Sequence, residues 1–223
     1  MTILPSSTVG KKIMMALTGQ LLVIFIIFHI AGNSTIFFHG LNAYVTALYK
    51  LPLFVWGGRL VLLLAFVFHI WYGTILKLEN HGAKPEPYAV TRYRSATFAG
   101  RNQIWTGVIV AVFLIYHLLQ FTFQVTNPAS AADTHPDALG RPDIFMMVVQ
   151  SFRHIGISGI YILSLAALGL HLLHGIQSSF QTWGMSNDRT LPVMEKTGTA
   201  ASVLLLVWYC AIPLAVVAGI LKQ

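Results

Sequence analysis

Five long apolar segments dominate the sequence and limit what the chain can fold into. They cover residues 13–38, 54–76, 104–125, 152–178 and 200–221. Each is long enough to cross a bilayer, since a helix of about 20 apolar residues spans the hydrocarbon core. Only 9% of the chain is charged, against about 25% in an ordinary soluble domain. We therefore predict one all-α integral membrane domain, residues 1–223, built as a bundle of five transmembrane helices.

The connecting segments carry unequal positive charge, which predicts the topology. Cytoplasmic loops of membrane proteins hold the excess of Lys and Arg, so we predict the N-terminus inside and the C-terminus outside. Lys11 and Lys12 precede an apolar run longer than that of a signal peptide, so we expect this helix to be retained. The net charge of +7 follows from this topology, and we expect contact with membrane lipid and no nucleic-acid partner. The inside then holds Lys11, Lys12, Lys77, Lys84, Arg92, Arg94, Arg101, Arg189 and Lys196.

Histidines within the apolar segments indicate a site inside the bundle. Ionisable residues in a membrane span are costly and usually face such a site. No Asp, Glu, Lys or Arg lies in the middle of any segment, so a charge-relay chain is not indicated. A neutral imidazole is, however, a good ligand for iron. The histidines in question are His29, His69, His117, His171 and His174.

Depth sorts four of these histidines into two pairs. At 1.5 Å per residue, His29 and His117 lie roughly 20–24 Å from the inner ends of their helices, and His69 and His171 lie about 10 Å from theirs. A zinc or copper site would need its ligands to converge on one point, whereas a haem takes one ligand from each side of a flat ring. We therefore predict two haems, an outer one on His29 and His117 and an inner one on His69 and His171.

Two further residues bear on the cofactors. His174 follows His171 by three residues, and it could replace His171 as a ligand, contact a haem propionate or a quinone, or pack in a polar niche. Cys210 is the one cysteine of the chain, so the C-x-x-C-H motif of covalent haem attachment is absent. The haems are therefore expected to be non-covalent.

Short motifs around the histidines match a known family. The chain resembles the cytochrome b subunit of succinate:quinone oxidoreductases, in the single-polypeptide, five-helix, di-haem type that includes fumarate reductases. The resemblance covers all five segments. It implies two b haems, each with two histidine ligands, and the spacing back from Trp183-Gly184 selects His171 over His174. The matching motifs are Leu17-Thr18-Gly19, Phe28-His29, Ser34-Thr35, Phe68-His69, Thr106-Gly107, His117, His171 with Gly175, and Thr182-Trp183-Gly184.

The resemblance also implies partners and a location. It implies a flavoprotein subunit and an iron–sulfur subunit docked on the inner face of a bacterial cytoplasmic membrane, with quinone, commonly menaquinone, as the membrane substrate. This chain has no flavin fingerprint and no cluster cysteines, so it would be the quinone-reactive subunit of a succinate dehydrogenase or fumarate reductase and inactive on succinate alone. The basic stretch 77–101 is either the docking surface or simply positive-inside topology. The oligomeric state and the direction of turnover stay open.

Polar residues near the ends of the helices are candidates for further contacts. Arg101 and His174 could pair with propionates of the inner haem. Some family members carry a glutamate, linked to proton movement across the membrane, where this chain has Gly169. Near the outer haem, the quinone candidates are Asn33, His39, Arg59, Gln120, Gln124, Arg153 and His154.

Two other classes of protein fit parts of the pattern. One is the di-haem cytochrome b of a membrane hydrogenase or formate dehydrogenase, which would differ in ligand placement and in its partner. The other is a transporter that uses intramembrane histidines as proton carriers and needs no haem. A visible spectrum and the co-purifying subunits separate these classes.

Overall fold

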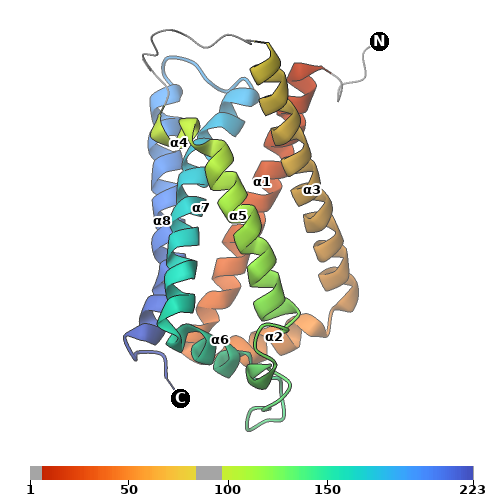
Figure 1. Cartoon of the computed structure of the whole chain (residues 1–223), viewed down its shortest axis with the longest axis vertical. Helices are drawn as coiled ribbons and strands as arrows, with labels where there is room; N and C mark the ends of the chain where they lie inside the picture. Colours follow the sequence, from red (N-terminus) through yellow and green to blue (C-terminus); the bar gives the residue numbers. More distant parts are fainter. Residues whose placement is uncertain (1–6, 84–96, 223) are drawn as a thin grey trace.

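The computed structural model describes residues 7–83 and 97–222, which form helices and loops without any strand. The predicted all-α fold is confirmed. Five of the helical stretches are long and apolar enough to span a membrane, as predicted: α1 with η2, α3, α5 with η3, α7 and α8. In chain order the elements are α1 (Thr8–Asn33), η2 (Ser34–Phe38), α2 (Leu41–Tyr49), α3 (Pro52–Gly82), α4 (Phe98–Arg101), α5 (Gln103–His117), η3 (Leu118–Thr122), η4 (Pro128–Ser130), α6 (Ile144–Arg153), α7 (Ile155–Thr182) and α8 (Leu191–Val217) (Figure 1).

The bounds of several predicted segments were wrong. The first begins at Thr8 and not at residue 13, and the second ends at Gly82 and not at residue 76. The fourth does not begin at residue 152, because Phe152 belongs to the separate helix α6 and α7 begins only at Ile155. His154, between them, has extended backbone angles that break the helix. The fifth begins at Leu191 and not near residue 200; Pro192 in its first turn suits a helix start. Hydropathy alone does not mark these ends, since capping and local backbone geometry decide them.

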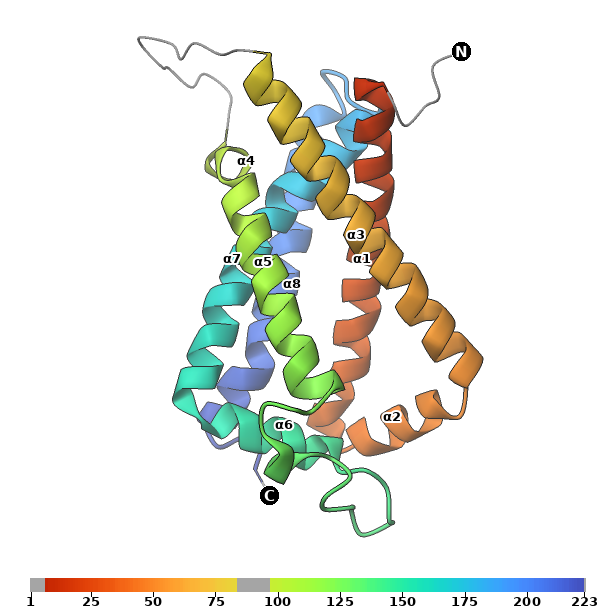
Figure 2. The ribbon, with the colours of Figure 1, turned by 45° about the vertical axis from the view of Figure 1, so that its right-hand side comes forward.

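The bundle has two distinct ends (Figures 1 and 2). At one end, here the α4 end, α1, α5 and α8 begin and α3 and α7 finish. At the opposite end, here the α2–α6 end, the short helices α2 and α6 lie across the bundle and the chain terminates. Lys11 of α1 pairs with Glu79 of α3 at the α4 end. Of the predicted docking loop, Lys84, Arg92 and Arg94 lie outside the described residues.

Packing is uneven around the bundle. Helix α7 packs on α8, α5 and α1, and α1 packs on α3, whereas α3 and α5 barely meet. Figure 2 shows α3 leaning away from α5 toward the α2–α6 end. Small residues let α7 approach its neighbours closely: a Cβ at Gly169 would lie 3.2 Å from Leu206 of α8. The large apolar side chains of α3, such as Phe54 and Leu60, are mostly exposed, as expected for a face toward lipid.

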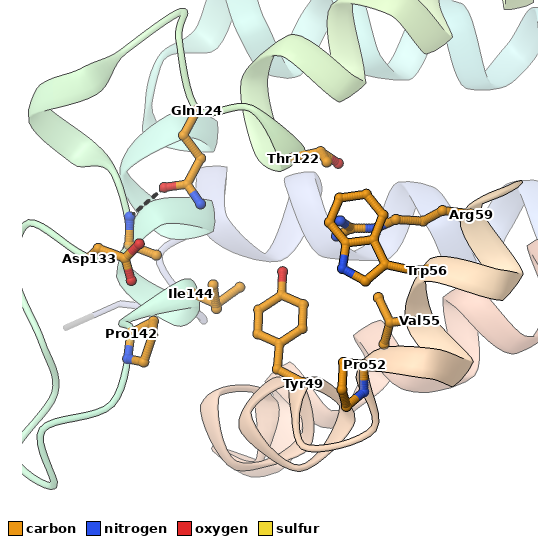
Figure 3. A pocket seen from close by; sticks show the side chains of 11 residues that line it. Tyr49, Pro52, Val55, Trp56, Arg59, Thr122, Gln124, Asp133, Pro142 and Ile144 are labelled. Carbon is orange, nitrogen blue, oxygen red and sulfur yellow. Dashed lines mark hydrogen bonds between the residues drawn. The ribbon is translucent and has the colours of Figure 1, made fainter. Parts of the chain in front are cut away.

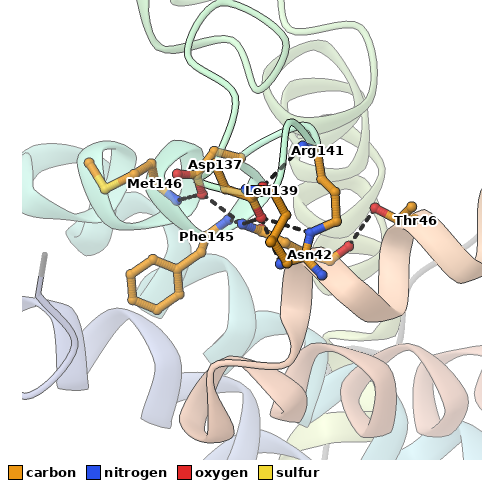
Figure 4. Close-up of polar contacts among 8 residues, drawn as sticks. Asn42, Thr46, Asp137, Leu139, Arg141, Phe145 and Met146 are labelled. Carbon is orange, nitrogen blue, oxygen red and sulfur yellow. Dashed lines mark hydrogen bonds and ion pairs between the residues drawn. The ribbon is translucent and has the colours of Figure 1, made fainter.

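A polar cluster ties the loop after α5 to helix α2 at the α2–α6 end (Figure 4). Asn42 is buried and its amide donates to the carboxylates of Asp137 at 3.2 Å and Asp143 at 3.0 Å. Its carbonyl oxygen accepts from the backbone N–H of Phe145 at 2.9 Å. Asp137 also pairs with the guanidinium of Arg141 at 2.7 Å. These bonds fix the start of α6 and so hold the loop after α5 against the bundle.

The charge of Asp137 should make this loop sensitive to acid. The guanidinium of Arg141, with backbone N–H groups of Arg141 and Leu139, holds the pKa of Asp137 well below its usual range. A carboxyl group whose pKa is lowered by folding stabilises the fold fully at a pH above its pKa in the unfolded chain, which is about 4. This stabilisation decreases as the pH falls below that value. We expect Asp137→Asn to lower the melting temperature in detergent at pH 7, and the gap from wild type to narrow toward pH 3. Asp133→Asn, at an exposed carboxylate of the same loop, is the control; a gap that is equal at both pH values would contradict the prediction.

Candidate functional site

Four histidines from four helices meet as two facing pairs inside the bundle. The ring centroids of His29 on α1 and His117 on α5 are 5.9 Å apart, with the ring planes at 88°. Those of His69 on α3 and His171 on α7 are 6.2 Å apart, at 71°. The structure thus brings together the same pairs that helical depth predicts. Their role as ligands stays a prediction.

The spacing within each pair fits a single metal ion. Histidine nitrogens bind a metal at about 2 Å and lie about 1 Å from the ring centroid, so two ligands of one ion have centroids about 6 Å apart. Both observed separations agree with this value. Within residues 7–83 and 97–222, no three His, Cys, Asp or Glu side chains gather as a metal site. Each pair therefore offers two imidazoles at a spacing that two ligands of one ion would have.

The His69–His171 pair rests on two matching backbone steps. His69 lies against Thr18-Gly19 of α1, where a Cβ on Gly19 would stand 3.1 Å from the ring carbon Cε1. His171 lies against Thr106-Gly107 of α5, where a Cβ on Gly107 would stand 3.2 Å from Cε1. Contacts this short require glycine or a displaced ring. Each Thr-Gly step therefore sets how closely the histidine of the neighbouring helix approaches.

The His29–His117 pair has different polar neighbours and an aromatic wall. Tyr161 of α7 donates to Gln120 Oε1 at 2.8 Å, and its hydroxyl lies 3.4 Å from Nδ1 of His117. The amide of Asn33 lies 3.2 Å from Nε2 of His29, so a metal ion bound at that nitrogen would displace this contact. A π-helical turn, η3, follows His117 directly and turns the buried Gln120 toward Tyr161; such turns are frequent at functional sites. Aromatic rings around the pair include Phe25, Phe113, Phe121 and Tyr209.

The two residues proposed for propionates lie near one another at the α4 end. Nδ1 of His174 is 3.0 Å from the position of a Cβ on Gly100, the chain neighbour of Arg101. His174 therefore faces α4, whereas His171 faces His69. Gln103 also reaches this region: its amide donates to the backbone oxygen of His171 at 3.2 Å, and its Oε1 is buried without a partner in the described part of the chain. A polar ligand group could satisfy that oxygen.

A cavity of about 400 Å³ opens at the α2–α6 end, and two of the seven residues predicted as candidates for quinone contact line it (Figure 3). Arg59 and Gln124 line it, and the guanidinium carbon of Arg59 lies 4.8 Å from the ring centroid of Trp56. Gln124 has a left-handed φ of 56° and accepts from the Ala132 N–H at 2.7 Å. The other lining residues are Tyr49, Pro52, Val55, Trp56, Thr122, Ala132, Asp133, Pro142 and Ile144.

The other five quinone candidates do not line this cavity. Asn33 and Gln120 are engaged beside the histidine pair. His39 caps η2 and packs on Phe145. Arg153 and His154 are exposed at the junction of α6 and α7.

The structure reveals Thr18 and Thr106 as partners of the site that residue-type reasoning missed. A repeated spacing could have found them: a Thr-Gly step precedes a histidine by eleven residues both in α1, at Thr18 and His29, and in α5, at Thr106 and His117. Eleven residues are close to three helical turns, so both members lie on one face. Helices α1 and α5 run in the same direction, as do α3 and α7 (Figure 2). The two halves of the site are therefore built alike.

Comparison of the chain with protein-family models, with curated proteins and with solved structures found no match.

A methyl group at Gly107 should disturb the His69–His171 pair. Gly107→Ala places a Cβ 3.2 Å from the His171 ring, so the ring must move from its position opposite His69. We expect loss of up to one of the two predicted haems per chain, measured by the pyridine haemochromogen assay. Gly159→Ala on α7, where a Cβ meets nothing within 4 Å, is the matched control. Wild-type haem content and spectrum in Gly107→Ala would count against the prediction.

Proposed function

We propose that the chain is the membrane cytochrome b subunit of a succinate:quinone oxidoreductase, with two b haems and a membrane quinone as substrate. The observation that carries this proposal is the meeting of four intramembrane histidines as two facing pairs at two depths. The proposal also rests on the motifs quoted above from all four of these helices. The spacing of each pair suits bis-histidine ligation, and a proton carrier has no need of paired, facing imidazoles.

Each residue of the site has a defined task in this proposal. His69 and His171 would hold one haem, and His29 and His117 the other. When bound, the two haems carry single electrons between the two ends of the bundle. The apolar and aromatic side chains around the pairs exclude water, and burial together with the axial ligands sets the haem potentials.

The α4 end is the proposed inner face. This end holds Lys11 and Lys12 in the first turns of α1, Lys77 near the end of α3, and Arg101 in α4, in line with an excess of Lys and Arg on the cytoplasmic side. Arg101 and His174 at the same end would contact haem propionates by charge-assisted hydrogen bonds. The flavoprotein and iron–sulfur subunits would dock here, because the histidine pair nearest this end would then receive their electrons.

The cavity at the α2–α6 end is the proposed quinone site. Its volume lies within the range of about 300–1,000 Å³ usual for ligand pockets. Trp56, Val55 and Ile144 offer apolar surface to a quinone ring, and Arg59 and Tyr49 offer donors to its carbonyl oxygens. Reduction of a quinone takes up two electrons and two protons. Asp133, exposed at the rim, could pass protons from the aqueous phase at this end.

Proton uptake from the opposite side would need another route. The position where some relatives of the proposed family carry a glutamate is Gly169 here. A Cβ at Gly169 would already lie 3.2 Å from Leu206, so α8 leaves no room for a carboxylate side chain in the present packing. We therefore propose that turnover involves no proton path through this position.

Substitution of the four histidines tests the haem pairing. His69→Ala and His171→Ala should each remove one haem, and His29→Ala and His117→Ala the other. The measurement is the low-spin b-type spectrum during a redox titration of the purified complex, which resolves the two haems. Absence of b-type bands in the wild type would contradict the proposal. Loss of the same haem from His29→Ala and His69→Ala would overturn the pairing, and loss from His174→Ala but not His171→Ala would overturn the ligand choice.

The partner subunits are tested by purification of the complex from its native membrane. Succinate dehydrogenase activity with flavin and iron–sulfur subunits supports the proposal. A nickel–iron subunit or a formate-oxidising subunit would favour the alternative cytochrome b class instead.

Arg59 tests the quinone site separately from the haems. Arg59→Leu removes a donor from the cavity, so we expect KM for a menaquinone analogue to rise about ten- to a hundredfold, since a hydrogen bond to a charged group contributes about 1.5–3 kcal/mol. Haem content should stay at the wild-type level. Arg153→Leu, at an exposed arginine outside the cavity, is the control and should leave KM unchanged. A wild-type KM in Arg59→Leu would exclude this cavity as the quinone site.

A further inference from the structure

We infer that Thr18 and Thr106 are positioning residues that select the ring tautomer of His69 and His171, leaving Nε2 of each ring free to bind a metal. This inference deepens the proposed function and rests on it for the identity of the metal cofactor. The tautomer itself follows from the hydrogen-bond geometry of this chain.

The hydroxyl of Thr18 has its single proton directed to its own helix. Its Oγ1 lies 2.8 Å from the backbone oxygen of Met14 and 3.1 Å from that of Met15. A carbonyl oxygen can only accept, so the hydroxyl donates to this pair. Nδ1 of His69 lies 3.4 Å from the same Oγ1. Since the hydroxyl proton is already engaged, the ring nitrogen must donate, which places the ring proton on Nδ1.

The second half of the site repeats this arrangement. Oγ1 of Thr106 lies 3.2 Å from the backbone oxygen of Asn102 and 3.1 Å from that of Gln103. Nδ1 of His171 lies 3.2 Å from that Oγ1. The three distances match those around Thr18 within a few tenths of an ångström. The same set of neighbours, two backbone oxygens and one ring nitrogen, surrounds a threonine hydroxyl at two separate positions. A chance contact is therefore a poor explanation.

The backbone beside each threonine adds to the same preference. The backbone oxygens of Met15 and Gln103, three positions before each threonine, accept from the threonine hydroxyl. The hydroxyl oxygen is therefore left with lone pairs alone to offer Nδ1. A neutral imidazole carries one ring proton, so Nε2 keeps its lone pair.

A hydrogen bond from Nδ1–H does more than orient a ligand. It makes the imidazole a stronger base and fixes the rotation of the ring about the metal–nitrogen bond. A stronger base favours the oxidised metal ion, so this bond should hold the potential of the bound haem low. In the His29–His117 pair only His117 has such a partner: the Tyr161 hydroxyl, which donates to Gln120, lies 3.4 Å from its Nδ1. His29 has no hydroxyl partner, and the amide of Asn33 lies 3.2 Å from its Nε2. The two haems would therefore differ in potential for a structural reason.

The first test uses Thr18→Val and Thr106→Val, which keep the shape of the side chain and remove the hydroxyl. Redox titration and EPR of the purified complex should show the haem of the His69–His171 pair shifted to a more positive potential, with altered g anisotropy. The other haem should keep both values. Thr18→Ser and Thr106→Ser, which restore the hydroxyl, should restore the wild-type signals. Thr197→Val is the control, since that hydroxyl bonds its own helix without meeting a histidine.

Each outcome decides the inference. An unchanged haem potential in both valine variants overturns it. An equal shift in the potentials of both haems, or an equal shift caused by Thr197→Val, also overturns it. Haem loss in the valine variants with retention in the serine variants supports it, and loss in both overturns it.

A second measurement is independent of haem. Nitrogen NMR of the ¹⁵N-histidine-labelled chain, purified without haem, should show Nδ1 protonated in His69 and His171 and a changed tautomer ratio in the valine variants. A wild-type complex without b haems would defeat the proposed function while this measurement still tests the tautomer. The opposite tautomer at both rings in the wild type would overturn the inference.

Discussion

Polar groups in a membrane bundle need partners inside the protein, and the rest of this structure depends on how the four histidines meet that need. Lipid supplies no hydrogen-bond partners, so an imidazole in a span must face another protein group or a ligand. Here each ring faces a ring from another helix, and its remaining nitrogen turns to a hydroxyl or amide. Glycine at positions 19 and 107 permits that approach. Consecutive spans cross in alternate directions, so α1 runs with α5 and α3 runs with α7 (Figure 2).

The two halves of the bundle follow the same order of elements, and α8 is an additional helix on one side. Helices α1 and α3 correspond to α5 and α7, and the short helices α2 and α6 cross the same end of each half (Figure 1). The close packing of α1 on α7 has no counterpart between α5 and α3. Helix α8 packs on α7 and α1, so it covers only the side of the bundle that these two helices form. Its hydrogen bonds from Tyr209 to the Ile26 oxygen of α1 and from Trp208 to Ser34 of η2 fix it there.

Much of this arrangement could be predicted from the sequence, because hydropathy and helical rise are regular. The five apolar segments predicted the five long helices. The depth of each histidine along its helix predicted which histidines could meet. Helix ends could not be predicted, since the break at His154 depends on local backbone angles and on the capping of α6 by Asp143. The partners Thr18 and Thr106 needed knowledge of which helices are neighbours. The cavity lined by Arg59 and Gln124 depends on the fold of the loop after α5, where the left-handed backbone at Gln124 is invisible to composition.

The sparse contact between α3 and α5 has a consequence for biogenesis. On the α8 side, insertion of a flat cofactor would require packed helices to separate, with loss of the contacts made by Gly169 and Leu206. On the α3–α5 side, α3 packs chiefly on α1, so separation of α3 from α5 would break no tightly packed interface. Under the proposed function, a porphyrin dissolved in the bilayer could therefore enter sideways from the lipid after all five spans are in place. Maturation of the subunit would then be a lateral loading step in the membrane, separate from the folding of the chain.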